Sequence, residues 1–339
     1  MGQVTFRVVL TAALFLACSW LPFGSAPRLA QAQIYRLAEL NTVQIRALNR
    51  QTTVVIIPGG VLEEHGPYLP SYTDGYANER LTADLAAAIA RRPGWTVVVF
   101  PAIPLGSGGA NSIGAKYSFP GSYGIRPAVL RAVFMDLATE FGEQGFRWIF
   151  VVHGHGGPHN IALDEAGDYF RDTYGGHMVH LLGLRPARMA WDSVIQTEVP
   201  SAARAEDGFT VHAGVAEHSV IMALRPDLVS AAIAQAPSLT ASDFAGLQRI
   251  AASPGWPGYF GAPRYASAEL GRRLVEAENH QFVTLALQIL DGLDERQIPR
   301  LSVIRGQSPG PASVWRASAV HDSTVEARQR AWLVRHGRR

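Results

Sequence analysis

Short apolar runs that alternate with longer helix-like stretches are the feature that most constrains this fold. The runs are rich in β-branched residues and lie at 53–58 (TVVIIP), 96–100 (TVVVF) and 148–152 (WIFVV). Uninterrupted runs of this length are typical of parallel strands that are buried on both faces. A fourth strand is expected at 177–182, and helices are expected at 78–91, 127–141 and 160–174, the last capped by Asn160. The alternation predicts an α/β fold with a mostly parallel central sheet and helices on both faces.

The first 32 residues differ from the rest of the chain. Arg7 precedes a strongly apolar stretch at 8–21, and the small-x-small triplet Ala30-Gln31-Ala32 follows it. This order is typical of a secretory signal peptide cleaved after Ala32, and the alternative is an uncleaved N-terminal anchor. The sequence therefore predicts a periplasmic or secreted protein with a signal peptide at 1–32, one folded domain at 33–305, and a C-terminal tail at 306–339 whose order it leaves open.

The mature chain is expected to be electrically neutral and free of cysteine. Loss of Arg7 and Arg28 with the signal peptide lowers the 30 basic residues to 28, which equals the number of acidic residues. This balance argues against binding to nucleic acid, and after cleavage no stable insertion in a membrane is expected. The one cysteine of the chain, Cys18, lies in the same leader. The mature chain then has no disulfide and no catalytic thiol, and it holds any metal through His, Asp or Glu.

The first segment with chemical information follows the run at 53–58. It reads GGVLEEHGP at 59–67 and is followed after a loop by Asp74. Glu63 and His65 are two residues apart, so in an extended stretch they point the same way and offer one oxygen and one nitrogen donor. Asp74 could return a second carboxylate to the same place. For this segment in isolation, a surface turn with incidental charges is the simpler explanation.

Three histidines among glycines follow the run at 148–152. The segment reads HGHGGPH and contains His153, His155 and His159. Because glycines weaken local order, such a segment is costly unless it serves a site, and neutral imidazole is a common ligand of zinc, manganese and iron. A helix-capping loop and an anion site at a helix N-terminus are the alternatives.

A third segment, HAGVAEHS at 212–219, leads into another apolar run. Glu217 offers a carboxylate, while His212 and His218 each offer a base or a ligand. Alone, the segment reads as an ordinary helix start with Glu in its first turn. The three segments together provide three carboxylates and several imidazoles, which suits a pair of divalent ions bridged by a carboxylate such as Asp74. Such a pair supports metal-assisted hydrolysis.

These segments resemble the motifs of the creatininase family of creatinine amidohydrolase-like proteins. GVLEEHGPYLP at 60–70, followed by Thr-Asp at 73–74, is similar to the family's GSTEQHGPHLP followed by Thr-Asp. HGHGG at 153–157 is similar to the family's NGHGGN loop, and HAGVAEHS at 212–219 is similar to its HAGxxETS motif. FPGS at 119–122 and RPDLV at 225–229 support the resemblance, which covers about residues 36–295.

The resemblance implies a three-layer α/β/α fold, usually found in homo-oligomers that are often hexamers. It implies that Glu63, Asp74 and His155 hold one metal and that His65, Asp74 and Glu217 hold the second, with Asp74 bridging. His212 is implied as acid or base on the departing nitrogen, with Glu217 beside it in the catalytic centre. Two divalent ions per chain are expected, with zinc preferred over manganese or iron.

The resemblance also implies a hydrolase that cleaves a C–N bond of a small amide, cyclic amide or formamide through a hydroxide bound to the two metals. The alternative is a non-catalytic or peptide-directed member of the same scaffold that binds metal and a small ligand. Four departures from the family motifs, at Glu64, His153, Pro158 and His218, are close in sequence to the implied ligands. We therefore expect these four residues to bear on substrate choice.

Two less regular stretches, 106–124 and 183–210, are expected to form the walls of the pocket. Tyr117, Tyr123 and Trp191 are their candidate contacts, and the second stretch is interpreted as a substrate-side loop. GSGGAN at 106–111 is a broken dinucleotide fingerprint, so no nicotinamide cofactor is expected.

Overall fold

A five-stranded parallel sheet forms the centre of the protein. The computed structural model describes residues 33–188 and 190–338, so the expected signal peptide lies outside the described residues. The strand order is β1-β3-β2-β4-β5, and every neighbouring pair is parallel. The strands are β1 (Gln33–Arg36), β2 (Thr53–Pro58), β3 (Thr96–Val99), β4 (Trp148–Val152) and β5 (His177–His180). The predicted parallel sheet is confirmed.

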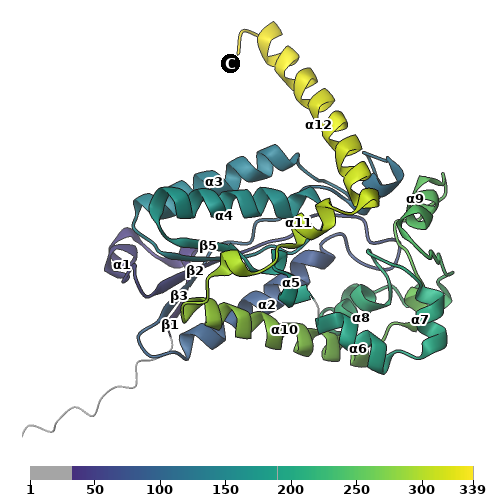
Figure 1. Cartoon of the computed structure of the whole chain (residues 1–339), viewed down its shortest axis with the longest axis horizontal. Helices are drawn as coiled ribbons and strands as arrows, with labels where there is room; N and C mark the ends of the chain where they lie inside the picture. The colour runs from purple at the N-terminus through teal and green to yellow at the C-terminus, as the bar shows by residue number, and fades with distance from the viewer. Residues whose placement is uncertain (1–32, 189, 339) are drawn as a thin grey trace, which may run out of the picture. The chain divides into compact units, whose positions relative to one another are not determined.

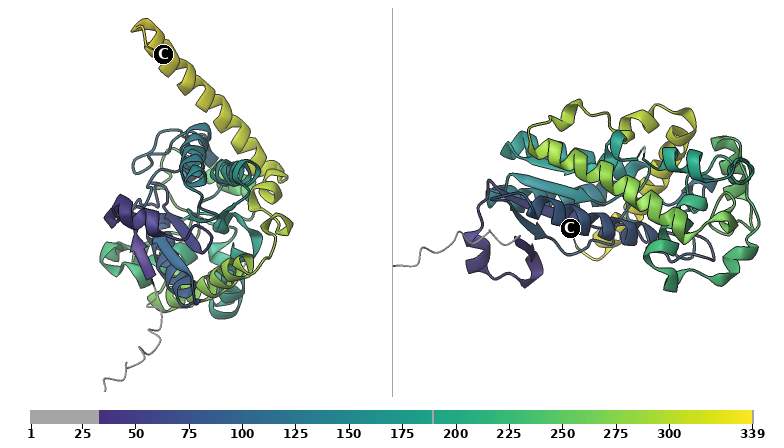
Figure 2. Two further views of the ribbon diagram at one scale, coloured as in Figure 1. Left: turned by 90° about the vertical axis from the view of Figure 1, so that its left-hand side faces the viewer. Right: turned by 90° about the horizontal axis from the view of Figure 1, so that it is seen from below.

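Two pairs of long helices cover the two faces of this sheet (Figures 1 and 2). One face is covered by α2 (Thr73–Ala90) and α10 (Ala268–Leu290). The other face is covered by α3 (Pro127–Glu143) and α4 (Pro158–Tyr174). The expected three-layer α/β/α fold is therefore confirmed.

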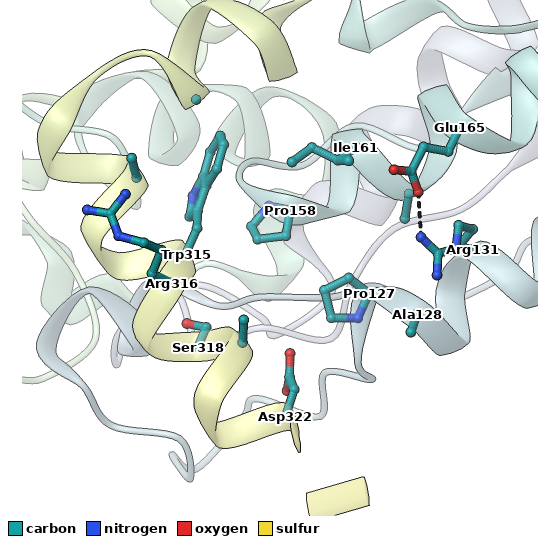
Figure 3. A pocket seen from close by; sticks show the side chains of 14 residues that line it. Pro127, Ala128, Arg131, Pro158, Ile161, Glu165, Trp315, Arg316, Ser318 and Asp322 are labelled. Atoms are coloured by element: carbon teal, nitrogen blue, oxygen red, sulfur yellow. Dashed lines mark hydrogen bonds and ion pairs between the residues drawn. The ribbon is translucent and has the colours of Figure 1, made fainter. Parts of the chain in front are cut away.

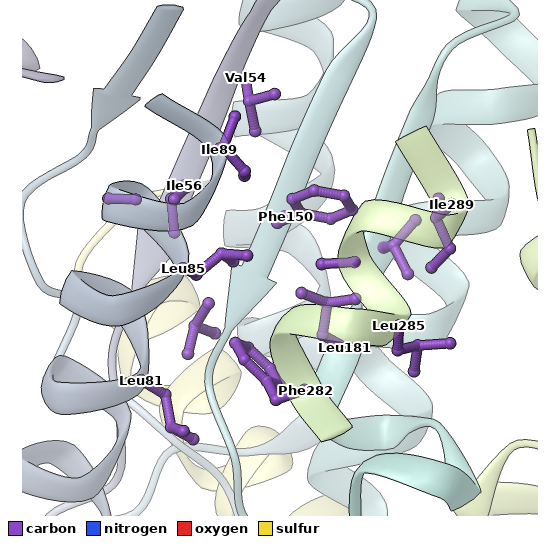
Figure 4. Close-up of a cluster of buried hydrophobic side chains, with 14 of the residues drawn as sticks. Val54, Ile56, Leu81, Leu85, Ile89, Phe150, Leu181, Phe282, Leu285 and Ile289 are labelled. Carbon is purple, nitrogen blue, oxygen red and sulfur yellow. The ribbon is translucent and has the colours of Figure 1, made fainter. Parts of the chain in front are cut away.

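Side chains along the central strands alternate between two buried clusters. Val54 and Ile56 of β2 join the cluster under α2 and α10, whereas Val55 and Ile57 join the cluster under α3 and α4. Figure 4 shows the first of these clusters, which includes Phe150 of β4. Because both faces of each central strand are buried, these strands are apolar without interruption.

Shorter helices and the long C-terminal helix α12 complete the chain around this core. The α-helices are α1 (Thr42–Ala47), α5 (Arg185–Arg188), α6 (Ala190–Glu198), α7 (Ser201–Asp207), α8 (Val215–Leu224), α9 (Phe244–Ala252), α11 (Leu301–Gly306) and α12 (Pro309–Arg335). The 3-10 helices are η1 (Leu37–Glu39), η2 (Ala110–Gly114), η3 (Leu181–Gly183), η4 (Pro226–Leu228), η5 (Ala231–Gln235), η6 (Pro263–Tyr265) and η7 (Glu295–Gln297).

Two helices begin earlier than the sequence predicts. α2 begins at Thr73, so Asp74 lies in its first turn, where the helix dipole favours an acidic side chain. α4 begins at Pro158, whose fixed φ suits the first helical position. Asn160 is therefore buried inside α4 and does not cap it, so that prediction is wrong. Both differences place chemistry-bearing residues at helix N-termini.

The interpretation of 183–210 as a loop is also wrong. Three helices, α5, α6 and α7, occupy most of this stretch. The three helices have 4, 9 and 7 residues, which is too short for a clear helical periodicity in the sequence. Pro200 at the N-cap of α7 and Gly208 at its C-cap also read as loop residues. Strand β1 was not expected either, because its four residues contain no apolar run.

The C-terminal tail, whose order the sequence leaves open, is helical from Pro309 to Arg335. Prolines 309 and 311 make this helix hard to predict from the sequence, although proline is tolerated in a first turn because the N–H that it lacks would have no helical acceptor there. Among the helices of residues 33–188 and 190–338, none has the length and hydrophobicity that crossing a membrane requires.

Candidate metal centre

The three histidine-containing segments meet beyond the carboxyl ends of β2 and β4. Glu63 and His65 follow β2, His155 follows β4, and Asp74 and Glu217 lie in the first turns of α2 and α8. Ligand atoms of Glu63, Asp74 and His155 lie within 4.8 Å of one another, and so do those of His65, Asp74 and Glu217. The structure thus brings together all five residues that the sequence singles out as ligands, in two groups that share Asp74.

The first group is built around the imidazole of His155. Its Nδ1 lies 2.8 Å from Oδ2 of Asp74 and 3.3 Å from Oε2 of Glu63. Its Nε2 donates to the backbone carbonyl of Gly108. In the neutral ring, Nδ1 then carries a lone pair that faces two carboxylate oxygens.

The second group repeats this arrangement around His65. Its Nδ1 donates to the carbonyl of Glu63 at 3.1 Å. Its Nε2 is buried, has no hydrogen-bond partner, and lies 3.6 Å from Oδ1 of Asp74 and 3.8 Å from Oε2 of Glu217. The lone pair of Nε2 therefore faces two carboxylates across distances that are longer than a hydrogen bond.

Both imidazoles fit metal ligation. A histidine ligand usually donates its outer N–H to a carbonyl or carboxylate, which fixes the tautomer and directs the other nitrogen at the metal. His65 and His155 each make such a donation to a backbone carbonyl. Lone pairs that face carboxylates repel one another unless a cation or a proton lies between them. The donor set therefore fits two divalent ions with Asp74 between them.

The clustering of charged groups shifts the pKa values of the carboxylates and of His65. Burial, together with the charges of Asp74 and Glu64, raises the pKa of Glu63 well above its usual range. For Asp74, burial acts in the same direction, but the neighbouring imidazoles of His155 and His65 outweigh it and hold the pKa of Asp74 well below its usual value. Burial alone would lower the pKa of His65, yet the carboxylates of Asp74 and Glu217 raise it. The site is thus a concentrated negative pocket suited to cations.

Backbone groups that sequence reasoning missed hold the carboxylates in place. The N–H of Ala110 donates to Oε1 of Glu63 at 2.6 Å, and the N–H of Ala213 donates to Oε2 of Glu217 at 2.6 Å. Ala213 has φ of 49°, a conformation that is costly for a residue with a Cβ atom. Asn78 of α2 donates to the carbonyls of Gly59 and Gly154, which ties the first two segments together. A sequence pattern gives no sign of these backbone contacts, because any residue type supplies an N–H.

His212 is buried next to Glu63 and lies on the cavity wall. Its Nε2 donates to the carbonyl of Glu64 at 2.6 Å, and its Nδ1 lies 3.5 Å from Oε1 of Glu63. Burial and the neighbouring His65 lower the pKa of His212 well below 6.5, so its Nδ1 is unprotonated. Glu63, His65 and His212 also form a third possible ligand group. The acid–base role expected of His212 stays a prediction.

A cavity of about 1180 Å³ opens onto this centre. Glu63, Asp74, His155, His212 and Glu217 line it. Its walls include all three aromatic residues expected from the sequence, Tyr117, Tyr123 and Trp191. Its roof contains residues of α11 and α12, which the sequence did not indicate.

Comparison with known proteins decides the family. The family model described as "Creatininase: Creatinine amidohydrolase" matches residues 38–286. The chain belongs to the creatininase family. The match includes the five candidate ligands and ends before α11 and α12.

Curated relatives in this family have two kinds of name. A "Mycofactocin precursor peptide peptidase" of Mycolicibacterium smegmatis is 29% identical over 56% of this chain, which spans 64% of the length of that relative. A protein of the same name from Mycobacterium ulcerans is 28% identical over 70% of this chain and 86% of its own length. A "Creatinine amidohydrolase" of Pseudomonas putida is 24% identical over 66% of this chain and 84% of its own length.

Solved creatininases share the fold. One described as "Creatininase Mn" superposes with a TM-score of 0.55 and 21% identity, covering 76% of this chain and 99% of its own. A creatininase mutant described as "Zn-Zn type" has a TM-score of 0.54 and 22% identity, covering 75% of this chain and 97% of its own. These solved relatives are therefore manganese or zinc proteins, and this creatininase-family chain has a candidate metal site in the same fold.

The departures from the family motifs lie in different environments. Pro158 lines the cavity. Glu64, His153 and His218 are buried and are not among the residues of its wall. The hydroxyl of Ser122, in the FPGS stretch, bonds to the carboxylate of Glu64, so this change joins two family motifs. Direct contact with the substrate is therefore expected of Pro158 alone among the four.

His153 has an interior structural role. Its Nε2 donates to the carbonyl of Ile103 at 2.9 Å, and its Nδ1 lies 3.0 Å from Nε2 of His159. The backbone N–H of Ser107 donates to Nδ1 of His159. A Cβ atom on Gly59 would lie 2.3 Å from the ring of His153, so this glycine makes room for the imidazole. The rings of His153 and His159 are therefore both neutral, and their hydrogen bonds hold in place the loop at 153–157 (the metal loop), which contains His155.

Replacing His153 with asparagine, the family's residue at this position, is expected to make the protein less sensitive to acid. Burial and the nearby His180 lower the pKa of His153 from 6.5 to about 3. The unfolded chain therefore binds one more proton between these values, and about 1.4 kcal/mol of stability is lost for each pH unit as pH falls through this window. The H153N variant loses that dependence. Chemical unfolding at several pH values, with a chelator present, measures the slope.

The matched control for this experiment is His336→Asn, because His336 is exposed in the last turn of the chain. H336N is expected to keep the slope of the unaltered chain. Equal slopes for H153N and the unaltered chain would show that the imidazole at 153 is protonated in the folded protein.

Proposed function

We propose that this protein is a metal-dependent hydrolase that cleaves the C–N bond of an amide. The observation that carries the proposal is the pair of ligand groups that share Asp74 on the wall of one large cavity. Two divalent ions held there would polarise an amide carbonyl and lower the pKa of a water between them. Zinc is proposed as the first choice and manganese as the second, since both occur in the descriptions of solved relatives.

The protein's own side chains supply position and proton transfer. His65 and His155 are oriented by their bonds to backbone carbonyls, and Glu63 and Glu217 by bonds from backbone N–H groups. His212 offers an unprotonated Nδ1 on the cavity wall, where it can take up a proton and return it to the departing nitrogen. Each group therefore has a defined task when the amide is bound.

The size of the cavity favours an extended, peptide-like amide. Pockets for drug-sized ligands are typically about 300–1,000 Å³, and this cavity of about 1180 Å³ exceeds that range. Two relatives are named as peptidases of a precursor peptide, which supports the same proposal. Small cyclic amides or formamides, the class expected from the sequence, are the second candidate, supported by the relative named creatinine amidohydrolase.

Metal analysis combined with a substrate panel tests the proposal. The chain, reconstituted with zinc or manganese, is expected to bind about two ions and to hydrolyse at least one member of a panel of short peptides, lactams and formamides. Peptides are expected to react faster than single-ring lactams. Two bound metals without turnover of any class would instead support a non-catalytic binding protein on this scaffold.

We also propose that the protein acts in the periplasm or after secretion and forms a homo-oligomer. The first proposal is supported by the signal-like order of residues 1–32, and the second by the oligomers that the resemblance to the family implies. Cell fractionation with sequencing of the mature N-terminus tests the first proposal. Light scattering on the purified chain tests the second.

A further inference from the structure

The roof of the metal cavity comes from a part of the chain that the family model does not match. The match ends at residue 286, whereas Arg305 of α11 and Trp315 of α12 line the same cavity as Asp74 and His155. This segment therefore lies outside the part of the chain that the family model matches, yet it lines the cavity of the candidate metal centre.

α11 is anchored to α4, the helix that follows the metal loop. The guanidinium of Arg300 donates twice to the carboxylate of Asp168, at 2.6 and 2.7 Å. The hydroxyl of Ser302 donates to Asp164 at 2.5 Å, and Leu301 is buried. These contacts fix the start of α11, so the position of Arg305 one turn later is set relative to the metal loop.

Arg305 and Trp315 lie over the two glycines that follow His155. A methyl group on Gly156 would lie 3.7 Å from Nη1 of Arg305, and one on Gly157 would lie 3.4 Å from Nε1 of Trp315. Figure 3 shows Trp315 beside Pro158, the first residue of α4. A guanidinium and an indole ring thus lie against the two residues that directly follow the candidate ligand His155.

Further contacts hold α12 across the cavity. The ring of His321 stacks on that of Tyr117, with centroids 4.2 Å apart and planes 6° from parallel. The carboxylate of Glu326 accepts from Arg126 at 2.7 Å. Both partners lie in the stretch before α3 and line the same cavity. His321 and Glu326 therefore hold α12 against the stretch of the cavity wall that precedes α3.

We propose that Arg305 forms a carboxylate-binding subsite beside the metal centre, with Trp315 as its flat wall. The inference deepens the proposed function, because it assigns a substrate class: amides that carry a free carboxylate near the bond to be cleaved. The planar fork of a guanidinium matches a carboxylate with two parallel hydrogen bonds, which a point charge does not. The subsite then selects peptide-like substrates by their terminal carboxylate and presents the adjoining amide to the metals.

Binding of two probes without an amide bond tests the subsite separately from catalysis. Hexanoate and hexanol have the same chain length and are not consumed, so calorimetric titration of the zinc-loaded full chain measures binding alone. The unaltered chain is expected to bind hexanoate at least about tenfold more tightly than hexanol, and Arg305→Ala is expected to lose about tenfold of this preference. Arg305→Lys, which keeps the charge without the fork, is expected to fall between them.

Controls separate this effect from the attraction of the metals for carboxylate. Arg335→Ala removes the same charge from the exposed last turn of α12 and is expected to leave the preference unchanged. Trp315→Ala is expected to weaken both probes alike. If Arg305→Ala keeps the preference for hexanoate while it binds two zinc ions and unfolds as the unaltered chain does, the metals alone hold the carboxylate and the subsite is refuted. A lack of amide turnover would leave this binding result intact and would count against the proposed function alone.

Discussion

Replacing Asp74 with asparagine is expected to lower both metal content and activity more than any other single change at this site. Asp74 is shared by the two ligand groups, with Oδ2 near His155 and Oδ1 near His65. The amide retains the shape of the side chain but removes its charge and one ligand oxygen. Loss of a residue behind a ligand costs roughly 10- to 100-fold in metal affinity or activity, and loss of a bridging ligand is expected to cost more than that.

Elemental analysis after dialysis measures this effect without an assay of activity. The D74N variant is expected to retain fewer than one zinc ion per chain, against about two in the unaltered protein. Asp84→Asn is the matched control, because Asp84 lies on the same helix and pairs with Arg80 on the outside of the protein. Two tightly bound ions in D74N, or undiminished hydrolysis of a panel substrate, would be incompatible with a bridging carboxylate at this position.

The sequence predicts the sheet because its strands are buried on both faces. β2 and β4 have the predicted bounds, since every residue of β2 is buried and all of them except Thr53 are apolar. β1 escapes prediction because it lies at the edge of the sheet and contains four residues of mixed character. The sequence pattern therefore predicts the buried central strands and the edge strand β5, but not the edge strand β1.

The sequence also predicts only part of the site, namely the side chains that could bind metal and not the groups that orient them. Side chains with metal-binding chemistry, such as His155 and Asp74, are visible in a sequence. The groups that orient them are mostly backbone atoms, as at Gly108, Ala110 and Ala213, and a sequence does not reveal where a backbone N–H or carbonyl points. His153 and His218, which are expected to bear on substrate choice, are buried and do not line the cavity, so any influence on the substrate is indirect.

α12 shows a second limit of sequence reasoning. Its charged and small residues give it little apolar periodicity, since much of it is exposed. Its inward side chains, among them Val314 and Trp315, line the cavity, and this role depends on residues that are distant in the sequence. The contribution of α12 to the cavity is therefore recognised only in the structure, where the other residues of the cavity lie around it.

Replacing His212 with glutamine is expected to separate proton transfer from metal ligation. The amide nitrogen of glutamine can take the place of Nε2 and keep the donation to the carbonyl of Glu64. It supplies no basic atom in place of Nδ1. The variant is therefore expected to keep about two metal ions and to lose about 10²- to 10⁴-fold in kcat, the usual contribution of a general acid–base group.

The outcome for metal content decides between two roles for this residue. His212 lies in a third possible ligand group with Glu63 and His65, so a ligand role predicts loss of an ion from H212Q together with loss of activity. A proton-transfer role predicts full metal content with low kcat and a nearly unchanged KM, because the ring then acts mainly in the transition state. His280→Gln, on the exposed side of α10, is the matched control and is expected to change neither quantity. Nδ1 of His212 lies 3.5 Å from Oε1 of Glu63, as close as Nε2 of His65 lies to its own carboxylate neighbours, so the metal content of H212Q decides which role the ring has.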